Sequence, residues 1–256
     1  MRLAAYQFGV TGDIRHNMEI ISKAVHMAAG QNVELLIFPE CAISGYPSRD
    51  IEKSSDLDPN AICNAITQIQ ALSDRFGIHI IIGTSFFDEH YYNRAYFFSP
   101  NQSAAWYGKR ALYGWDEQNF VASIENGIFQ IGEFTIGVRI CFEIRFPEYF
   151  RELYKAHTDL NIVLFYDVSD VDDTDRYHLI RSHLLTRAVE NVTPFLSVNA
   201  ISPFQTAPTC FIDASGKVLA ETTRNQEGIL IFDYEKTAPN FGELGRIKYS
   251  DLLLKE

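Results

Sequence analysis

The sequence predicts a mixed α/β protein whose helices and sheets form layers within one domain. Segments with helical spacing alternate with buried strands, and some of those strands continue into hairpins. No linker, repeat or low-complexity segment interrupts the 256 residues. A chain of this length can enclose a sizeable core. We therefore expect residues 1–256 to form a single domain.

Composition and charge exclude several classes of protein. A hydrophobic content of 46% with 21% charged residues is ordinary for a globular chain. The net charge of −11 argues against a nucleic-acid or anionic-membrane partner. Residues 1–9 lack the basic start of a signal peptide, and no apolar run is long enough to span a membrane, so we expect a cytoplasmic location. The four scattered cysteines form no C-x-x-C pair, which argues against disulfides and a zinc site.

The first strands place one carboxylate at a sheet edge. Arg2–Phe8 is predicted to be a strand, and Asp13 is placed to cap a helix that Gly30 ends. Glu34–Phe38 is a nearly continuous apolar run, which indicates a strand covered on both faces. A proline follows this run, so Glu40 is expected at the carboxyl end of the strand.

The next elements place a lysine at a strand end. Isoleucines and a leucine recur at helical spacing through Pro59–Phe76. Ile78–Phe86 is predicted to be a buried strand, with Tyr91–Phe98 and Ser103–Gly108 as its antiparallel continuation. Lys109 then directly follows the last of these strands.

In the stretch Phe134–Glu148, the pattern of apolar residues changes from that of a strand to that of a helix near a cysteine. Phe134–Ile140 alternates as a strand does, and Pro147 suits the first turn of a helix. Cys141 therefore lies in a strand-to-helix turn, a geometry that exposes a nucleophile and places positive backbone potential beside it, which is expected to lower the pKa of the thiol. The alternative is that Cys141 is a small buried hydrophobic residue.

The remaining segments complete the α/β pattern. Arg110–Glu125 is expected to be irregular, and Asp173–Asn191 to be a helix. A tight turn is predicted at Ser215-Gly216 and a final helix at Tyr249–Lys255. Further strands are predicted at Leu160–Phe165, Pro194–Asn199, Thr209–Asp213, Lys217–Glu221 and Gly228–Asp233.

Three polar residues that follow apolar strands lie in recognisable motifs. The segments Leu36-Ile37-Phe38-Pro39-Glu40, Tyr107-Gly108-Lys109 and Arg139-Ile140-Cys141-Phe142-Glu143-Ile144-Arg145-Phe146-Pro147-Glu148 resemble the three motif regions of the nitrilase, or carbon–nitrogen hydrolase, superfamily. The resemblance continues in the family's order through Arg187–Asn191, Ser197–Asn199 and Ile212–Leu219.

This resemblance implies a four-layer α-β-β-α sandwich that assembles into homodimers or larger homo-oligomers. It also implies a catalytic set of Glu40, Lys109 and Cys141. The family usually has a second glutamate about eight residues beyond the lysine, and Glu117 occupies that position. The implied chemistry requires neither a metal nor another cofactor.

The chemistry gives each of these residues a role. Glu40 would deprotonate Cys141 as it attacks a carbonyl and would then protonate the departing amine, leaving a thioester on the sulfur. Lys109 and the backbone N–H of Phe142 would stabilise the negative oxygen. Glu117 would orient Lys109 or hold the N–H groups of the substrate. The alternative is a simple structural ion pair between Glu40 and Lys109.

Other residues are weaker candidates for substrate contacts. Tyr46 and Phe142 could line a pocket, although buried aromatic residues commonly only fill the core. Asn199 could bind substrate or satisfy loop backbone. Glu143 and Arg145 are expected to brace the turn after the nucleophile rather than to contact substrate.

The acidic segment Tyr166–Asp175 departs from the family pattern. Tyr166 and Asp167 are candidate substrate contacts, and aspartates of this segment could select a cationic substrate. The alternative is a solvated loop in which Asp172 or Asp173 caps the following helix.

The activity favoured by the sequence is hydrolysis of a small amide or N-carbamoyl compound. Nitrile hydrolysis and glutaminase-type ammonia donation remain alternatives within the superfamily. Gly45–Asp50 and Tyr113–Glu117 resemble the glutaminase portion of glutamine-dependent NAD synthetases, but we expect a stand-alone amidase rather than an ammonia donor fused to a synthetase. The alternative from another class is a non-catalytic binding or scaffold protein on the same fold.

Overall fold

The computed structural model describes residues 1–254. The helices and strands in chain order are β1 (Arg2–Gln7), α1 (Ile14–Ala29), β2 (Leu35–Ile37), α2 (Pro59–Phe76), β3 (His79–Asp88), β4 (His90–Phe98), β5 (Ala105–Gly108), α3 (Trp115–Asn119), β6 (Ile128–Ile131), β7 (Phe134–Ile140), α4 (Pro147–Lys155), β8 (Leu160–Phe165), β9 (Val168–Ser169), α5 (Thr174–Asn191), β10 (Phe195–Asn199), β11 (Phe204–Gln205), β12 (Cys210–Ile212), β13 (Val218–Glu221), β14 (Gly228–Asp233) and α6 (Phe241–Leu253). Two 3₁₀ helices, η1 (Ser54–Asp56) and η2 (Cys141–Arg145), lie between them.

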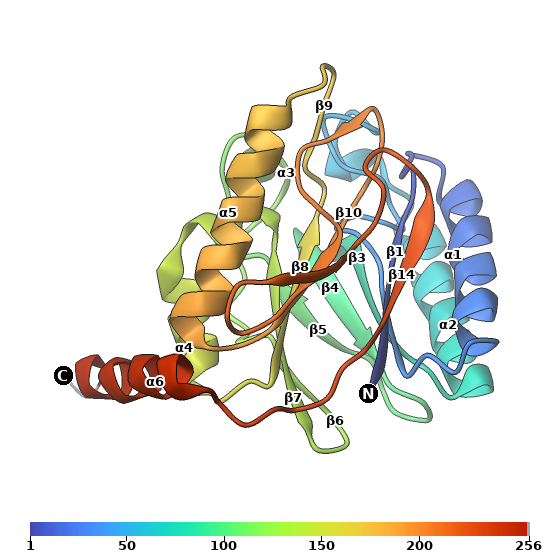
Figure 1. Ribbon diagram of the computed structural model, residues 1–256. Coiled ribbons are helices and arrows are strands. Elements are labelled where there is room, and N and C mark those ends of the chain that lie inside the picture. The colour runs from blue at the N-terminus through green and yellow to red at the C-terminus, as the bar shows by residue number, and fades with distance from the viewer. Residues whose placement is uncertain (255–256) are drawn as a thin grey trace.

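Two six-stranded sheets pack face to face between two layers of helices, as Figure 1 shows. One sheet has the strand order β14-β1-β2-β3-β4-β5, and the other has the order β13-β12-β10-β8-β7-β6. Helices α1 and α2 cover the first sheet, and α4 and α5 cover the second. A separate pair, β9 and β11, adds a small third sheet. The predicted four-layer α-β-β-α arrangement is confirmed.

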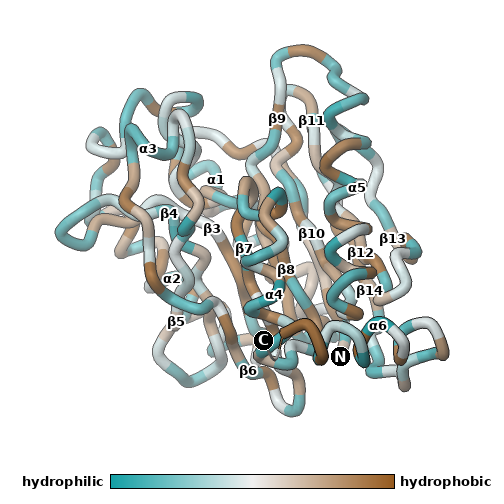
Figure 2. The backbone as a smooth tube through the Cα atoms, turned by 90° about the vertical axis from the view of Figure 1, so that its left-hand side faces the viewer, coloured by the Kyte–Doolittle hydropathy of each residue, from teal (hydrophilic) through white to brown (hydrophobic). Residues whose placement is uncertain are grey.

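Successive side chains of a strand point to opposite faces of its sheet, so one sheet contributes to two hydrophobic cores. In β1, Leu3 and Ala5 belong to the cluster between the two sheets, whereas Ala4 and Tyr6 belong to the cluster beneath α1 and α2. Both faces of the strand are therefore buried in apolar surroundings, and Figure 2 shows hydrophobic colour along the central strands. This explains why strands of this chain are nearly continuous apolar runs.

The sequence predicted most elements, but it missed some. The bounds predicted for β8 and β14 are those observed. Strand β6 and the short helix α3 were not predicted, and α3 lies inside the segment expected to be irregular. The final helix begins at Phe241 instead of Tyr249, with Asn240 as its cap. Phe241 is 95% exposed, so the start of this helix carries no buried apolar stripe by which to recognise it; Lys255 lies outside the described residues.

Parallel strands bring the motif residues to one edge of the sandwich. β1, β2 and β3 run parallel in the first sheet, and β7, β8 and β10 run parallel in the second. Glu40 follows β2, Cys141 follows β7 and Tyr166 follows β8. A hydrogen bond from the Tyr166 backbone N–H to Glu40 joins the two edges. In α/β proteins, ligands bind at such carboxyl ends.

The helices of residues 1–254 include none that is both long and apolar enough to span a membrane.

Gly83 in β3 allows the backbone that carries Glu40 to lie close to the sheet. A Cβ atom placed on Gly83 would lie 2.5 Å from the Cα of Glu40 and 2.5 Å from the backbone nitrogen of Cys41. Both contacts are with backbone atoms, which cannot rotate away as a flexible side chain could.

We predict that Gly83→Ala lowers the free energy of unfolding by roughly 1–3 kcal/mol, because the added methyl group overpacks this contact. Gly228→Ala is the matched control, since a Cβ on this β-strand glycine would meet nothing within 4 Å. Urea denaturation of both variants measures the difference. Equal stability of the two variants would show that the segment at Glu40 can shift without cost.

Candidate active site

A buried lysine connects two carboxylates at the edge of the first sheet. Lys109 Nζ lies 2.8 Å from Glu40 Oε1 and 2.7 Å from Asp116 Oδ2. All three side chains are almost completely buried. Glu40 follows β2, Lys109 follows β5 and Asp116 belongs to α3, so segments far apart in the sequence converge on one ammonium group.

The two carboxylate oxygens of Glu40 have different partners. Oε1 accepts hydrogen bonds from Lys109 Nζ at 2.8 Å and from Asn93 Nδ2 at 2.7 Å. Oε2 accepts one from the Tyr166 backbone N–H at 2.8 Å. Burial raises the pKa of Glu40 above its usual range, while the charge of Lys109 opposes this rise. Burial alone would lower the pKa of Lys109, but the charge of Glu40 and the other surrounding groups raise it well above its usual value.

Asp116 occupies the place that the sequence assigned to Glu117. Glu117 is exposed, and its carboxylate accepts a hydrogen bond from the backbone N–H of Gly114 at the start of α3. The neighbouring side chain of Asp116 points to the interior instead, where it also accepts a hydrogen bond of 2.6 Å from the hydroxyl of Tyr46. The prediction that Glu117 contacts Lys109 is therefore wrong by one residue. The helical turn of α3 decides which of two adjacent acids faces inward, and its formation was not predicted.

Cys141 lies where the sequence predicted, at the turn between β7 and a helix. It opens the 3₁₀ helix η2 and has a φ of 45°, in the left-handed region that non-glycine residues seldom adopt. The residue is partly exposed. Backbone strain of this kind occurs where a fold fixes a side chain for function.

The pKa of the Cys141 thiol shifts in the direction opposite to our prediction. Desolvation and the negative charge of Glu40 raise it well above its usual value, and the opposing effect of Lys109 is smaller. The prediction of a lowered thiol pKa is wrong because it considered only the backbone of the turn. The resting side chain is therefore a neutral thiol, which needs a base before it can act as a nucleophile.

Glu143 braces the turn after Cys141, as the sequence predicted. Its Oε2 accepts a hydrogen bond of 2.7 Å from the Ile140 backbone N–H, and its Oε1 accepts one of 2.8 Å from the Arg110 backbone N–H. The hydroxyl of Tyr107 also donates to Oε1, at 2.7 Å. One buried carboxylate thus joins the backbone before Cys141 to the backbone after Lys109.

A pocket of about 210 Å³ opens over Lys109 and Cys141. The predicted substrate contacts Tyr46, Phe142, Tyr166 and Asp167 all line it. The rings of Tyr46 and Tyr166 stack on one another, with centroids 4.9 Å apart. Residues that line the pocket but were not predicted as substrate contacts are Arg49, Tyr113, Trp115, Asp116, Val168 and Arg176.

Asn199 braces the loop beside the pocket and is not one of the lining residues. Its Oδ1 accepts a hydrogen bond from the Asp167 backbone N–H, and its Nδ2 donates to the backbone oxygens of Asp167 and Ala207. Of the two roles considered for Asn199, satisfying loop backbone is the one that these contacts bear out.

Four of the five aspartates of the acidic segment are paired with an arginine or serve as a helix cap, and Asp175 is exposed. Asp167 pairs with Arg176, Asp170 with Arg49, and Asp172 with Arg224. Asp173 caps α5, as predicted, by accepting a hydrogen bond from the Arg176 backbone N–H. The arginine pairs thus neutralise three of the aspartates that were expected to select a cationic substrate, including Asp167, which lines the pocket.

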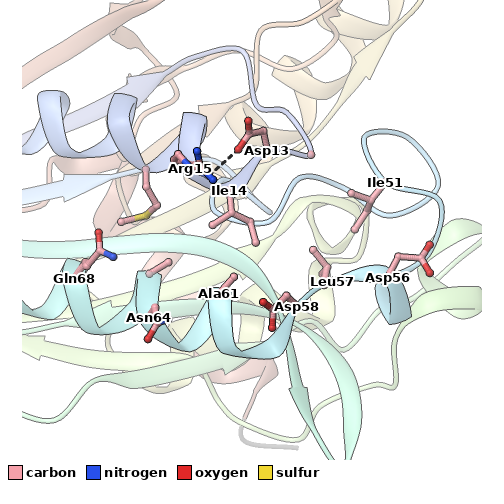
Figure 3. A pocket seen from close by; sticks show the side chains of 13 residues that line it. Asp13, Ile14, Arg15, Ile51, Asp56, Leu57, Asp58, Ala61, Asn64 and Gln68 are labelled. Carbon is pink, nitrogen blue, oxygen red and sulfur yellow. Dashed lines mark hydrogen bonds between the residues drawn. The ribbon is translucent and has the colours of Figure 1, made fainter.

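A larger hollow of about 660 Å³ lies apart from these residues, between the first turns of α1 and α2. Figure 3 shows Asp13, Arg15, Asp58 and Asn64 around it. Asp13 and Asp58 cap their own helices, so the polar groups at those two helix starts are already satisfied. The hollow lacks a cysteine, and none of Glu40, Lys109 and Cys141 lines it.

No group of three or more His, Cys, Asp or Glu side chains within residues 1–254 is arranged to hold a metal ion.

Comparison with known proteins places this site in a family. The model of the family described as carbon–nitrogen hydrolase matches residues 2–237. The chain belongs to the carbon–nitrogen hydrolase family and is an enzyme of that class.

Relatives share the fold at low sequence identity. A probable nitrilase of Schizosaccharomyces pombe is 24% identical over 86% of this chain and 83% of its own length. The 2-oxoglutaramate amidase of Bacillus subtilis is 28% identical over 78% of this chain and 77% of its own length. A solved structure of an amidase from Nesterenkonia sp. AN1 superposes with a TM-score of 0.84 at 20% identity, covering 100% of this chain and 95% of that one.

We predict that Asp116→Asn lowers hydrolytic kcat/KM about 10²-fold, because Lys109 loses a charged partner that fixes its position. Glu117→Gln is the matched control and should stay within about twofold of wild type, since Glu117 only caps α3. Steady-state kinetics on one small amide measures both variants. A larger loss in the Glu117 variant would reassign the second carboxylate.

Proposed function

We propose that the protein is an amidase that hydrolyses the C–N bond of a small amide or N-carbamoyl substrate through a thioester on Cys141. The observation that carries this proposal is the buried Lys109, held between Glu40 and Asp116 in the pocket that Cys141 enters. A purely structural ion pair would not require a partly exposed, strained cysteine beside it.

Glu40 is the proposed general base. Its Oε1 already accepts two hydrogen bonds and its Oε2 accepts one, so Oε2 has a lone pair available for the proton of the thiol. The raised pKa of Cys141 makes this proton transfer necessary, and the raised pKa of Glu40 makes the carboxylate a better proton acceptor.

Lys109 is the proposed stabiliser of negative charge on the substrate. As the sulfur bonds to the carbonyl carbon, the carbonyl oxygen becomes an anion, and a pre-positioned ammonium group stabilises it without reorganisation. Lys109 donates one hydrogen bond to Glu40 and its ammonium group pairs with Asp116, which leaves an N–H group for this oxygen. We assign the backbone N–H of Phe142 to the same role.

The remaining steps return the enzyme to its starting state. Protonated Glu40 gives its proton to the nitrogen, the C–N bond breaks, and the amine or ammonia leaves a thioester on Cys141. Water then loses a proton to Glu40 and attacks the thioester carbon. The C–S bond breaks, the acid is released, and the sulfur regains its proton.

The known relatives support the amidase assignment. A solved structure of a glutamate-to-leucine mutant of the amidase from Nesterenkonia sp. AN1 shows covalent addition of the acetamide moiety of fluoroacetamide at the active-site cysteine. The Bacillus subtilis relative is also an amidase. Because another relative is a probable nitrilase, nitrile hydrolysis is the alternative activity, and Cys141 would be the nucleophile in that reaction as well.

Assembly into homodimers or larger homo-oligomers, and a cytoplasmic location, stay predictions from the sequence. Exposed apolar side chains of α6, such as Phe241 and Leu253, provide a surface for self-association.

We predict that a small amide yields ammonia and an acyl adduct on Cys141 in a quenched reaction, because the thioester must form before water attacks. Intact-protein and peptide mass spectrometry detects the adduct. Cys141→Ala should abolish both products, and Cys63→Ala, at an exposed position on α2, should retain them. A panel of small amides, N-carbamoyl compounds and nitriles that yields neither ammonia nor adduct would instead support a non-catalytic protein.

We predict that kcat/KM falls on the acid side of the pH profile at a pH above the usual pKa range of a carboxyl group. The reason is that Glu40 must be ionised to act and burial raises its pKa. Activity should therefore be lost as the pH falls through this raised pKa. Asn93→Ala should move the limb to still higher pH, because the hydrogen bond from Asn93 stabilises the charged form. A pH–rate profile of both proteins measures the shift; an unmoved or lowered limb would contradict the assignment of Glu40.

A further inference from the structure

Two arginines line the pocket beside Lys109 and Cys141. Arg49 comes from the loop after β2, and Arg176 comes from the first turn of α5. Each forms an ion pair with the segment that follows β8: Arg49 with Asp170 and Arg176 with Asp167. The two guanidinium groups thus pair with the residues directly before and after β9 in the sequence. Val168 of that strand also lines the pocket.

The carboxylate of Asp167 accepts three hydrogen bonds from protein groups. Its Oδ1 accepts hydrogen bonds from Arg176 Nε at 2.8 Å and from the hydroxyl of Thr206 at 2.5 Å. Its Oδ2 accepts one from Arg176 Nη2 at 3.0 Å. Asp167 is only 7% exposed, so its charge serves to fix the planar fork of Arg176 and has little capacity for a substrate cation.

The pair between Arg49 and Asp170 is different in strength. The side chain of Arg49 is 17% exposed, whereas that of Asp170 is 81% exposed. An ion pair with a carboxylate so exposed to water contributes little and exchanges readily. Arg49 can therefore turn toward an anion in the pocket without leaving a buried charge unpaired.

Both arginines on this wall of the pocket have unused hydrogen-bond donors. Within residues 1–254, Arg176 bonds to protein through Nε and Nη2, which leaves Nη1 free. The side chain of Arg49 bonds only through Nη2, which leaves Nε and Nη1 free. A pair of arginine forks with free N–H groups matches the geometry of a carboxylate.

We propose that Arg49 and Arg176 select an amide whose acyl chain ends in a carboxylate, that is, the monoamide of a short dicarboxylic acid. The inference rests on the proposed amidase function and names its substrate class. Cys141 attacks the amide carbonyl at one end of the chain while the two guanidinium groups hold the carboxylate at the other end. The pocket volume of about 210 Å³, equal to about seven water molecules at roughly 30 Å³ each, limits the substrate to a short chain.

Three amides of equal chain length test the charge preference. Glutaric acid monoamide carries a terminal carboxylate, pentanamide ends in a methyl group, and 5-aminopentanamide ends in an ammonium group. The wild-type enzyme should hydrolyse glutaric acid monoamide with a kcat/KM at least about tenfold above that of the other two, as expected for charge-assisted hydrogen bonds made to one substrate alone. Ammonia release measures all three.

Substitutions test whether Arg49 and Arg176 cause the preference for the amide with a terminal carboxylate. Arg49→Gln leaves no buried carboxylate unpaired, because the Asp170 side chain is 81% exposed. The double change Arg176→Gln with Asp167→Asn removes both charges of the other pair, which avoids leaving the buried Asp167 carboxylate unpaired. Each should reduce the ratio of kcat/KM between glutaric acid monoamide and pentanamide, mainly by raising KM for the anionic substrate. Arg224→Gln is the matched control, because Arg224 pairs with Asp172 of the same segment and does not line the pocket; it should keep the wild-type ratio.

The outcomes separate the two levels of the proposal. Equal rates on the charged and neutral amides, or a preference for 5-aminopentanamide, would overturn the carboxylate assignment and leave the amidase function standing. A ratio that survives in both the Arg49 and the Arg176 variants would also overturn it. Failure to hydrolyse any of the three amides would overturn the carboxylate assignment. The proposed function falls as well only when the wider panel of small amides and N-carbamoyl compounds also yields neither ammonia nor an acyl adduct on Cys141.

Discussion

The ammonium group of Lys109, buried between the carboxylates of Glu40 and Asp116, is the interaction on which the rest of the site depends. Taking each of these ions out of water costs several kcal/mol, and their mutual attraction offsets that cost only when the geometry is good. The two short distances, 2.8 and 2.7 Å, meet this condition. The ends of β2 and β5 and the short helix α3 must therefore all be in place together, and the first sheet supplies the frame that holds them.

The second sheet supplies the cysteine, and the carboxylate of Glu143 fixes the position of this cysteine relative to the first sheet. Glu143 bonds to the backbone on both sides of the site, at Ile140 before the nucleophile and at Arg110 after the lysine. Tyr166 adds a further link from the end of β8 to Glu40. The relative position of base and nucleophile therefore depends on backbone hydrogen bonds, which are more rigid than contacts between long side chains.

On one side of the pocket, Arg49 and Arg176 form ion pairs with aspartates of the segment that follows β8. In the acidic segment after β8, each of Asp167, Asp170 and Asp172 has an arginine partner. A cluster of like-charged residues in a sequence gives the number of charges but not their partners. Arg49 and Arg224 lie far from the segment along the chain, one on either side, so no local pattern reveals these two pairings.

The sequence by itself determined the layers of the fold, the strand ends at Glu40 and Lys109, and the turn at Cys141. The α/β pattern, the strand ends and the turn follow from local periodicity and from prolines and glycines, which act over a few residues. The four-layer arrangement was implied by the resemblance to the nitrilase superfamily. Only the tertiary structure decided that Asp116 and not Glu117 meets Lys109, that Asn199 braces a loop, and that the pKa of the Cys141 thiol is raised. The physical reason is that burial, charge pairing and the inward face of a short helix depend on neighbours distant in the chain, which one-dimensional spacing does not specify.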